Sequence, residues 1–146
     1  MSEEQQQQLQ SFAYQLRQME AQLNAITSQE NSIAKVIIES KNAMESLQQF
    51  IESKKSKDSE FILPIGAGVL IKITQPASDT SLINVGSDVL IEKNMSEVIK
   101  DLELRIKNLE TSIVEFQKQR FALEKQVTIG RNHLNSMLQN NNVNPT

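Results

Sequence analysis

The stretch that decides the fold runs from Leu9 to Ile51 and reads LQSFAYQLRQMEAQLNAITSQENSIAKVIIESKNAMESLQQFI. Steps of three and four residues alternate through it without a slip, and eleven of the thirteen positions they reach are apolar. A repeat of about 3.5 residues sustained over roughly six heptads is typical of a coiled-coil seam rather than of the wider stripe of a globular surface helix. The seam positions are Leu9, Phe12, Leu16, Met19, Leu23, Ile26, Glu30, Ile33, Ile37, Ser40, Met44, Leu47 and Ile51.

The same pattern starts again at Met95 and runs to Met137, with eleven apolar residues among thirteen seam positions. Each array predicts a helical rod of roughly 65 Å. Because the arrays are equally long and closely spaced, we expect the second rod to fold back antiparallel along the first; the alternative is two unrelated long helices. The second seam consists of Met95, Ile99, Leu102, Ile106, Leu109, Ile113, Phe116, Arg120, Leu123, Val127, Gly130, Leu134 and Met137.

The segment between the arrays has a different character, because most of the glycines and prolines lie there. It contains four β-type runs, and short glycine-containing links join the runs in pairs, as in β-hairpins. The links are Gly66-Ala67-Gly68 and Gly86-Ser87-Asp88, and the runs are Phe61–Ile65, Val69–Thr74, Leu82–Val85 and Val89–Lys93. The sequence therefore predicts a mainly α chain with a small β region: a coiled-coil helix over 1–55, two β-hairpins over 56–93, and a second coiled-coil helix with its tail over 94–146. Asn94 is the expected N-cap of the second helix, and Glu97 completes a capping box.

The predicted strands are apolar on both faces, whereas a half-exposed sheet alternates with polar residues. Some 33 residues cannot cover two apolar faces, and the outer strands would present unpaired edges. We therefore expect the hairpins to pair with other chains in a shared barrel or sandwich. The expected oligomerisation residues are Ile65, Gly66, Gly68, Val69, Ile71, Ile73, Ile83, Val85, Val89 and Ile91.

The far end of the predicted rod has no charge over residues 5–16 and 132–146. With the rods in register, seam residues pair when their numbers sum to about 146, so Leu9 lies near Met137 and Phe12 near Leu134. We interpret this end as a surface that binds other proteins through apolar contacts, and we expect residues 1–7 and 140–146 to be frayed tails. The proposed contact residues, called the tip below, are Leu9, Phe12, Tyr14, Leu16, Leu134, Met137 and Leu138.

Three interruptions of the seam are informative. Glu30 and Arg120 sum to 150, so they are expected within about one turn of each other, either as a pair that sets register or as two independent side chains. Gly130 is expected to loosen the second rod near its end, at about 1 kcal/mol relative to alanine.

The composition argues against several classes of function. The net charge of −3 argues against a nucleic-acid binder, and no apolar run approaches the roughly 18–20 residues of a membrane span. There is no cysteine, His133 has no partner at metal-binding spacing, and Gly66-Ala67-Gly68 lacks the lysine of a P-loop. No nucleophile–base constellation can be assembled, so we predict a cytoplasmic protein that is not an enzyme and uses no cofactor or metal.

The central segment resembles the alpha class of prefoldins, which are ATP-independent chaperone subunits. The similar stretches are Leu63-Pro64-Ile65-Gly66-Ala67-Gly68-Val69-Leu70-Ile71 and Ile83-Asn84-Val85-Gly86-Ser87-Asp88-Val89-Leu90-Ile91-Glu92-Lys93. Asp88 departs from the family pattern, which often has glycine there. The layout of helix, two hairpins and helix is also that of the alpha class.

The resemblance implies a hexamer of two alpha and four beta subunits, built on β-barrels formed between subunits from the hairpins. It also implies that the coiled-coil tips hold unfolded client proteins and deliver them to a group II chaperonin. The alternative is a structural coiled-coil scaffold whose hairpins join copies of itself.

Overall fold

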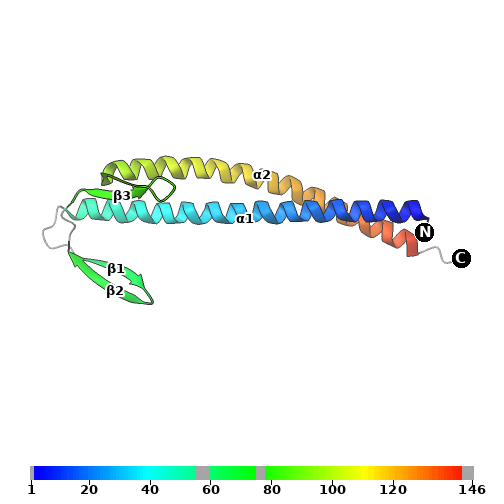
Figure 1. The fold of residues 1–146 in the computed structure, drawn as a ribbon, viewed down its shortest axis with the longest axis horizontal. Coiled ribbons are helices and arrows are strands. Elements are labelled where there is room, and N and C mark those ends of the chain that lie inside the picture. The colour runs from blue at the N-terminus through cyan, green and yellow to red at the C-terminus, as the bar shows by residue number, and fades with distance from the viewer. Residues whose placement is uncertain (1, 55–59, 75–77, 143–146) are drawn as a thin grey trace. The chain divides into compact units, whose positions relative to one another are not determined.

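The computed structural model describes residues 2–54, 60–74 and 78–142, and over these residues it contains two long helices and two β-hairpins (Figure 1). Helix α1 spans Glu3–Ser53 and helix α2 spans Met95–Asn142. Between them lie β1 (Glu60–Gly66), β2 (Val69–Thr74), β3 (Thr80–Asn84) and β4 (Leu90–Asn94). This order confirms the predicted fold class.

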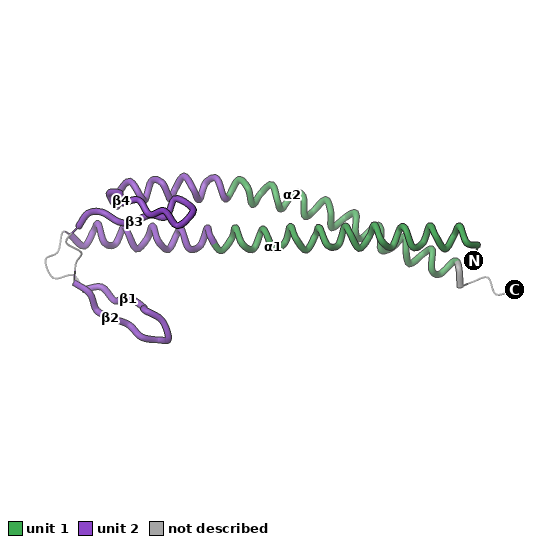
Figure 2. Tube along the Cα trace, viewed as in Figure 1, with its two compact units in different colours: residues 1–35, 110–146 green, residues 36–109 purple. Residues whose placement is uncertain are grey.

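The chain divides into two compact units, each of which contains a segment of both helices (Figure 2). The first unit comprises residues 1–35 and 110–146, and the second comprises residues 36–109 with all four strands. Within the first unit the two helices run antiparallel, because Glu20 contacts Arg131 while Glu30, further along α1, contacts Arg120.

Burial follows the heptad pattern in both helices. Every predicted seam position, including Glu30, Ser40, Arg120 and Gly130, is buried or half-buried. Few side chains fall below one tenth exposed, because a seam between only two helices leaves the flanks of each apolar residue open to solvent. The predicted seam is therefore confirmed throughout.

The hairpins form two separate two-stranded antiparallel sheets over the described residues. In the first, Leu63 pairs with Ile71, and the register shifts between Pro64 and Gly66. In the second, Ile83 pairs with Ile91. Among residues 2–54, 60–74 and 78–142 no barrel closes, so both sheets keep open edges.

Both hairpin turns require left-handed backbone, which explains their composition. Gly66 and Gly68 have φ of 113° and 76°, and Gly86 has φ of 119°. In the second turn Asp88 has φ of 59°, a conformation that Asp tolerates better than most residues. The turn therefore forms although Asp88 departs from the family pattern.

The second unit has its own small core, in which β3 packs against both helices. Ile83 is buried with Val98 and Leu102, and Met44 and Leu47 of α1 pack against this cluster. The junction between β4 and α2 is fixed by polar contacts, since Asn94 Oδ1 accepts a hydrogen bond from the Ser96 N–H at 3.1 Å. The predicted N-cap is thus confirmed.

Candidate protein-interaction surfaces

The first hairpin exposes apolar side chains on both faces. Ile62 and Leu63 are neighbours in β1, so they point to opposite faces, and they are 63% and 43% exposed. In a monomeric soluble protein a patch of this kind usually marks an interface. Ile65, Val69 and Ile71, among the expected oligomerisation residues, are also exposed, whereas Ile73 is half-buried.

The second hairpin divides its apolar residues between the inside and the outside of the chain. Val85, Val89 and Ile91 are exposed, but Ile83 is 7% exposed and belongs to the core of the second unit. Ile83 therefore anchors the hairpin to the helices within this chain. The turn residues Gly66 and Gly68 have open space around them, so their role is the backbone conformation itself.

The structure brings the two halves of the tip together in the first unit. The rings of Phe12 and His133 lie edge to face, with centroids 5.1 Å apart and an interplanar angle of 78°. This places Phe12 next to the residue that precedes Leu134, which confirms the predicted antiparallel register.

Tip residues differ in how accessible they are. Tyr14 is 63% exposed and Leu138 is 44% exposed. Seam positions Leu9, Phe12, Leu134 and Met137 are half-buried. Leu16 is only 5% exposed, so its side chain supports the seam and is not available at the surface.

Gly130 explains how closely the helices approach below the tip. A Cβ atom added at Gly130 would lie 2.9 Å from Leu16 Cδ1, with Phe12 Cζ at 3.8 Å and Met19 Cε at 3.9 Å. Helix α2 continues through this position to Asn142. The missing side chain at Gly130 therefore makes room for Leu16, and the expectation that this glycine also loosens the rod stays a prediction.

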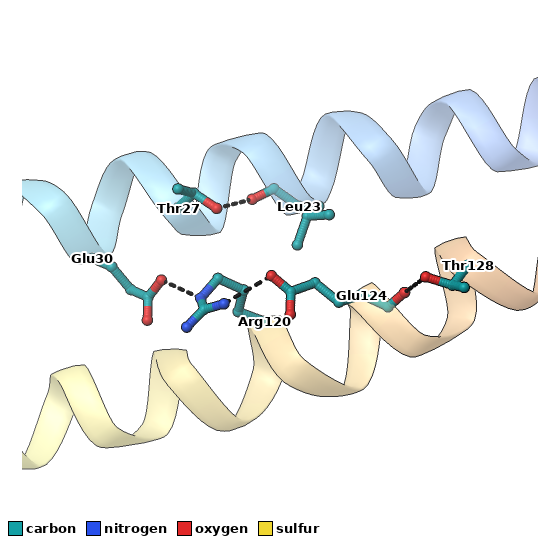
Figure 3. A network of polar contacts seen from close by, with 6 residues as sticks. All are labelled: Leu23, Thr27, Glu30, Arg120, Glu124 and Thr128. Atoms are coloured by element: carbon teal, nitrogen blue, oxygen red, sulfur yellow. Dashed lines mark hydrogen bonds and ion pairs between the residues drawn. The ribbon is translucent and has the colours of Figure 1, made fainter.

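Glu30 and Arg120 meet across the seam, as their numbers predicted (Figure 3). Arg120 Nε donates to Glu30 Oε2 at 2.7 Å, and a second guanidinium nitrogen donates to Glu124 Oε1 at 2.8 Å. These hydrogen bonds, first with Glu124 and then with Glu30, raise the pKa of Arg120. Glu124 was missed by the sequence analysis, although its i,i+4 spacing from Arg120 signals such a contact.

A second feature that the sequence analysis missed is an exposed apolar face on α2, beside Arg120 and Glu124. Phe121 and Ile129 lie outside the seam and are 59% and 69% exposed. We call these two side chains the Phe121–Ile129 face. Their signal in the sequence is the placement of two large apolar residues at heptad positions that normally carry polar side chains.

The described residues contain no group of three His, Cys, Asp or Glu side chains that could hold a metal ion. Within that same part of the chain, neither helix is long and apolar enough to cross a membrane. The described chemistry is that of contact surfaces: apolar strands, an apolar tip and paired surface charges.

Comparison with known proteins agrees with this architecture. A sequence profile of the prefoldin family, described as prefoldin subunit, matches residues 12–139. Prefoldin subunit alpha 1 of Methanocaldococcus jannaschii is 31% identical over 118 residues, covering 81% of this chain and 79% of the relative. Prefoldin subunit alpha of Nitrosopumilus maritimus is 29% identical over 140 residues, covering 95% and 92%.

A solved structure shows the same fold at low sequence identity. The cryo-EM structure of filamentous PFD from Methanocaldococcus jannaschii superposes with a TM-score of 0.61 at 17% identity, covering 77% of this chain and 91% of that chain. The matching profile spans most of the sequence, including both hairpins and most of each helix. This chain therefore belongs to the prefoldin family and resembles its alpha subunits over nearly its whole length.

Proposed function

We propose that this chain is the alpha-class subunit of a cytoplasmic, ATP-independent holdase that captures unfolded client proteins at its tips and delivers them to a group II chaperonin. Family membership supports a chaperone-type role and assembly with other prefoldin subunits. The observation that carries the finer proposal is the tip, where exposed Tyr14 and Leu138 stand on an apolar seam, in stretches of sequence that contain no Asp, Glu, Lys or Arg.

The proposed assembly is a hexamer of two alpha and four beta subunits. Its support is the first hairpin, which exposes apolar side chains on both faces and keeps unpaired strand edges. In a barrel shared between subunits, the edge strands would pair their backbone N–H and C=O groups with other strands, and the apolar faces would be removed from water. The second hairpin, anchored through Ile83, would fix the direction in which the helices leave that barrel.

Capture by the tip needs weak contacts that accept many unfolded sequences. Tyr14 offers a large apolar ring with a polar end, and Met137 can repack around irregular shapes. Each contact contributes about 1–2 kcal/mol from its buried area. Capture should therefore depend on several tips that act on one client together.

The structural alternative, a scaffold that only joins coiled coils, uses the same hairpins but needs no apolar tip. The two functions are separated by measuring light scattering while a denatured client is diluted into the assembled complex. Tyr14→Ser with Leu138→Ser is the informative variant, because both side chains are exposed and their removal leaves the seam intact. Ile38→Ser is the matched control, since Ile38 is also an exposed apolar residue, at 59%, on the helix that carries Tyr14.

The tip variant is expected to assemble normally, as judged by native mass spectrometry, and to protect the client less than wild type. The control is expected to protect fully. Equal protection by the tip variant and wild type would show that the tip does not bind clients.

Transfer to a group II chaperonin is tested by following a fluorescent client from one complex to the other on a size-exclusion column.

A further inference from the structure

The Phe121–Ile129 face has no role in the seam or in the hairpins. A shallow groove of about 300 Å³ connects its two side chains, and its remaining lining consists of Glu124, Lys125 and Thr128. Of the neighbouring seam positions, Leu123 is half-buried and Val127 is buried. The two apolar side chains are therefore surplus to the packing of the helices against each other.

The two charged side chains that line the groove, Glu124 and Lys125, each already make a contact within the chain. The Glu124 carboxylate is already held by Arg120 at 2.8 Å. The Lys125 ammonium lies over the Phe121 ring, 4.7 Å from its centroid, and covers one face of that ring. A cation–π contact at an exposed site is weak, so an incoming apolar group can replace it. The displaced ammonium would then face the occupant, which favours a segment with an acidic residue beside its apolar one.

The area of the face limits what can occupy it. At their observed exposure, Phe121 and Ile129 each present on the order of 100 Å². A stable interface between folded proteins needs roughly 800 Å² on each partner. The face is too small for a permanent subunit contact, and its size suits one or two apolar side chains from a partner that binds transiently.

We propose that the Phe121–Ile129 face is a second client contact, which binds isolated apolar side chains of an unfolded polypeptide. This inference rests on the proposed holdase function and adds a site below the tip. Ile129 and Leu138 are nine residues apart on one helix, or about 14 Å along its axis. At 3.6 residues per turn, a separation of nine residues also rotates the side chain by about 180°, so the two sites lie on opposite sides of α2 and are separate contacts for a client.

Photo-crosslinking in the assembled complex tests the occupant directly. A benzophenone amino acid replaces Phe121 in one preparation and Leu104 in a control preparation. Leu104 is a suitable control because it is 61% exposed on the same helix. Crosslinks from position 121 to a denatured client, reduced by excess unlabelled client, are expected, with few from position 104. Crosslinks to another subunit alone, or equal client yields at both positions, would overturn the proposal.

A functional test uses Phe121→Ser with Ile129→Ser, and Leu104→Ser as control. The double variant is expected to assemble normally and to require several-fold more complex for the same protection, while the control matches wild type. If wild type itself gives no protection, the holdase function fails. If wild type protects and the double variant protects equally well, the holdase stands and the second site does not exist.

Discussion

Gly130 offers the sharpest test of the packing described here, because alanine at this position has two opposing effects. In a helix interior, replacing glycine by alanine stabilises by about 1 kcal/mol through backbone entropy. At Gly130 the new Cβ would lie 2.9 Å from Leu16 Cδ1, and Leu16 is only 5% exposed. Forcing an extra methyl into such a contact costs about 1–3 kcal/mol. Gly130→Ala is therefore expected to range from neutral to about 2 kcal/mol destabilising.

Removing the Leu16 side chain should reverse the sign of this effect. Leu16→Ala alone is expected to destabilise the first unit by about 2–5 kcal/mol, because it leaves a cavity at a buried seam position. In that background the nearest remaining neighbours are Phe12 Cζ at 3.8 Å and Met19 Cε at 3.9 Å, which are ordinary contact distances, so Gly130→Ala should recover about 1 kcal/mol. The two substitutions are thus expected to be coupled by roughly 1–3 kcal/mol in a double-mutant cycle.

Hydrogen exchange of peptides from both helices of the first unit is the suitable measurement. It reports local opening, whereas the melting temperature of an oligomer also depends on subunit concentration. Wild type, both single variants and the double variant are compared at one pH and one protein concentration. If Gly130→Ala stabilises by the same amount with and without Leu16, the helices are further apart at this position than the structure places them.

Reversing the charge of either Glu30 or Arg120 should increase hydrogen exchange in the first unit more than reversing both, and additive effects would contradict the pairing. The Asp101 hydrogen bond raises the pKa of Lys93 above 10.5, so this pair stabilises β4 fully below that pH and loses its effect as pH rises through the raised pKa. In methyl NMR the second hairpin should therefore loosen in alkaline solution, and Asp101→Asn should abolish that step. Ile71→Asp should block assembly with other prefoldin subunits while helicity by circular dichroism stays high, and a normal complex in native mass spectrometry would count against a hairpin-built interface.

The heptad pattern was sufficient to predict both helices and their register, because a seam is a property of residue spacing alone. Strand ends were less predictable. The third strand begins at Thr80 rather than Leu82, since Thr80 and Ser81 pair with Asn94 and Lys93 through backbone hydrogen bonds that need no apolar side chain.

The candidate surfaces were predicted less completely, for two physical reasons. Spacing identifies which residues face the partner helix but not how closely the backbones approach, so the fit of Leu16 against Gly130 could not be foreseen. A heptad pattern also assigns every position outside the seam to solvent, so it does not single out Phe121 and Ile129 as exposed apolar side chains. Both features depend on distances and exposures that only the folded chain supplies.

The Arg120 guanidinium, which bonds both Glu30 and Glu124, bears on how accurately the two helices pair. Most seam positions carry interchangeable aliphatic side chains, so sliding one helix past the other by seven residues would preserve nearly all apolar contacts. That slip would bring Glu30 opposite Ile113 or Val127 and place its carboxylate against an apolar side chain. Exchange of α1 or α2 with a coiled coil from another subunit would incur the same mismatch unless that coil carried a complementary charge at the same height. One ion pair would thus favour the observed pairing of α1 with α2 over these mismatched ones.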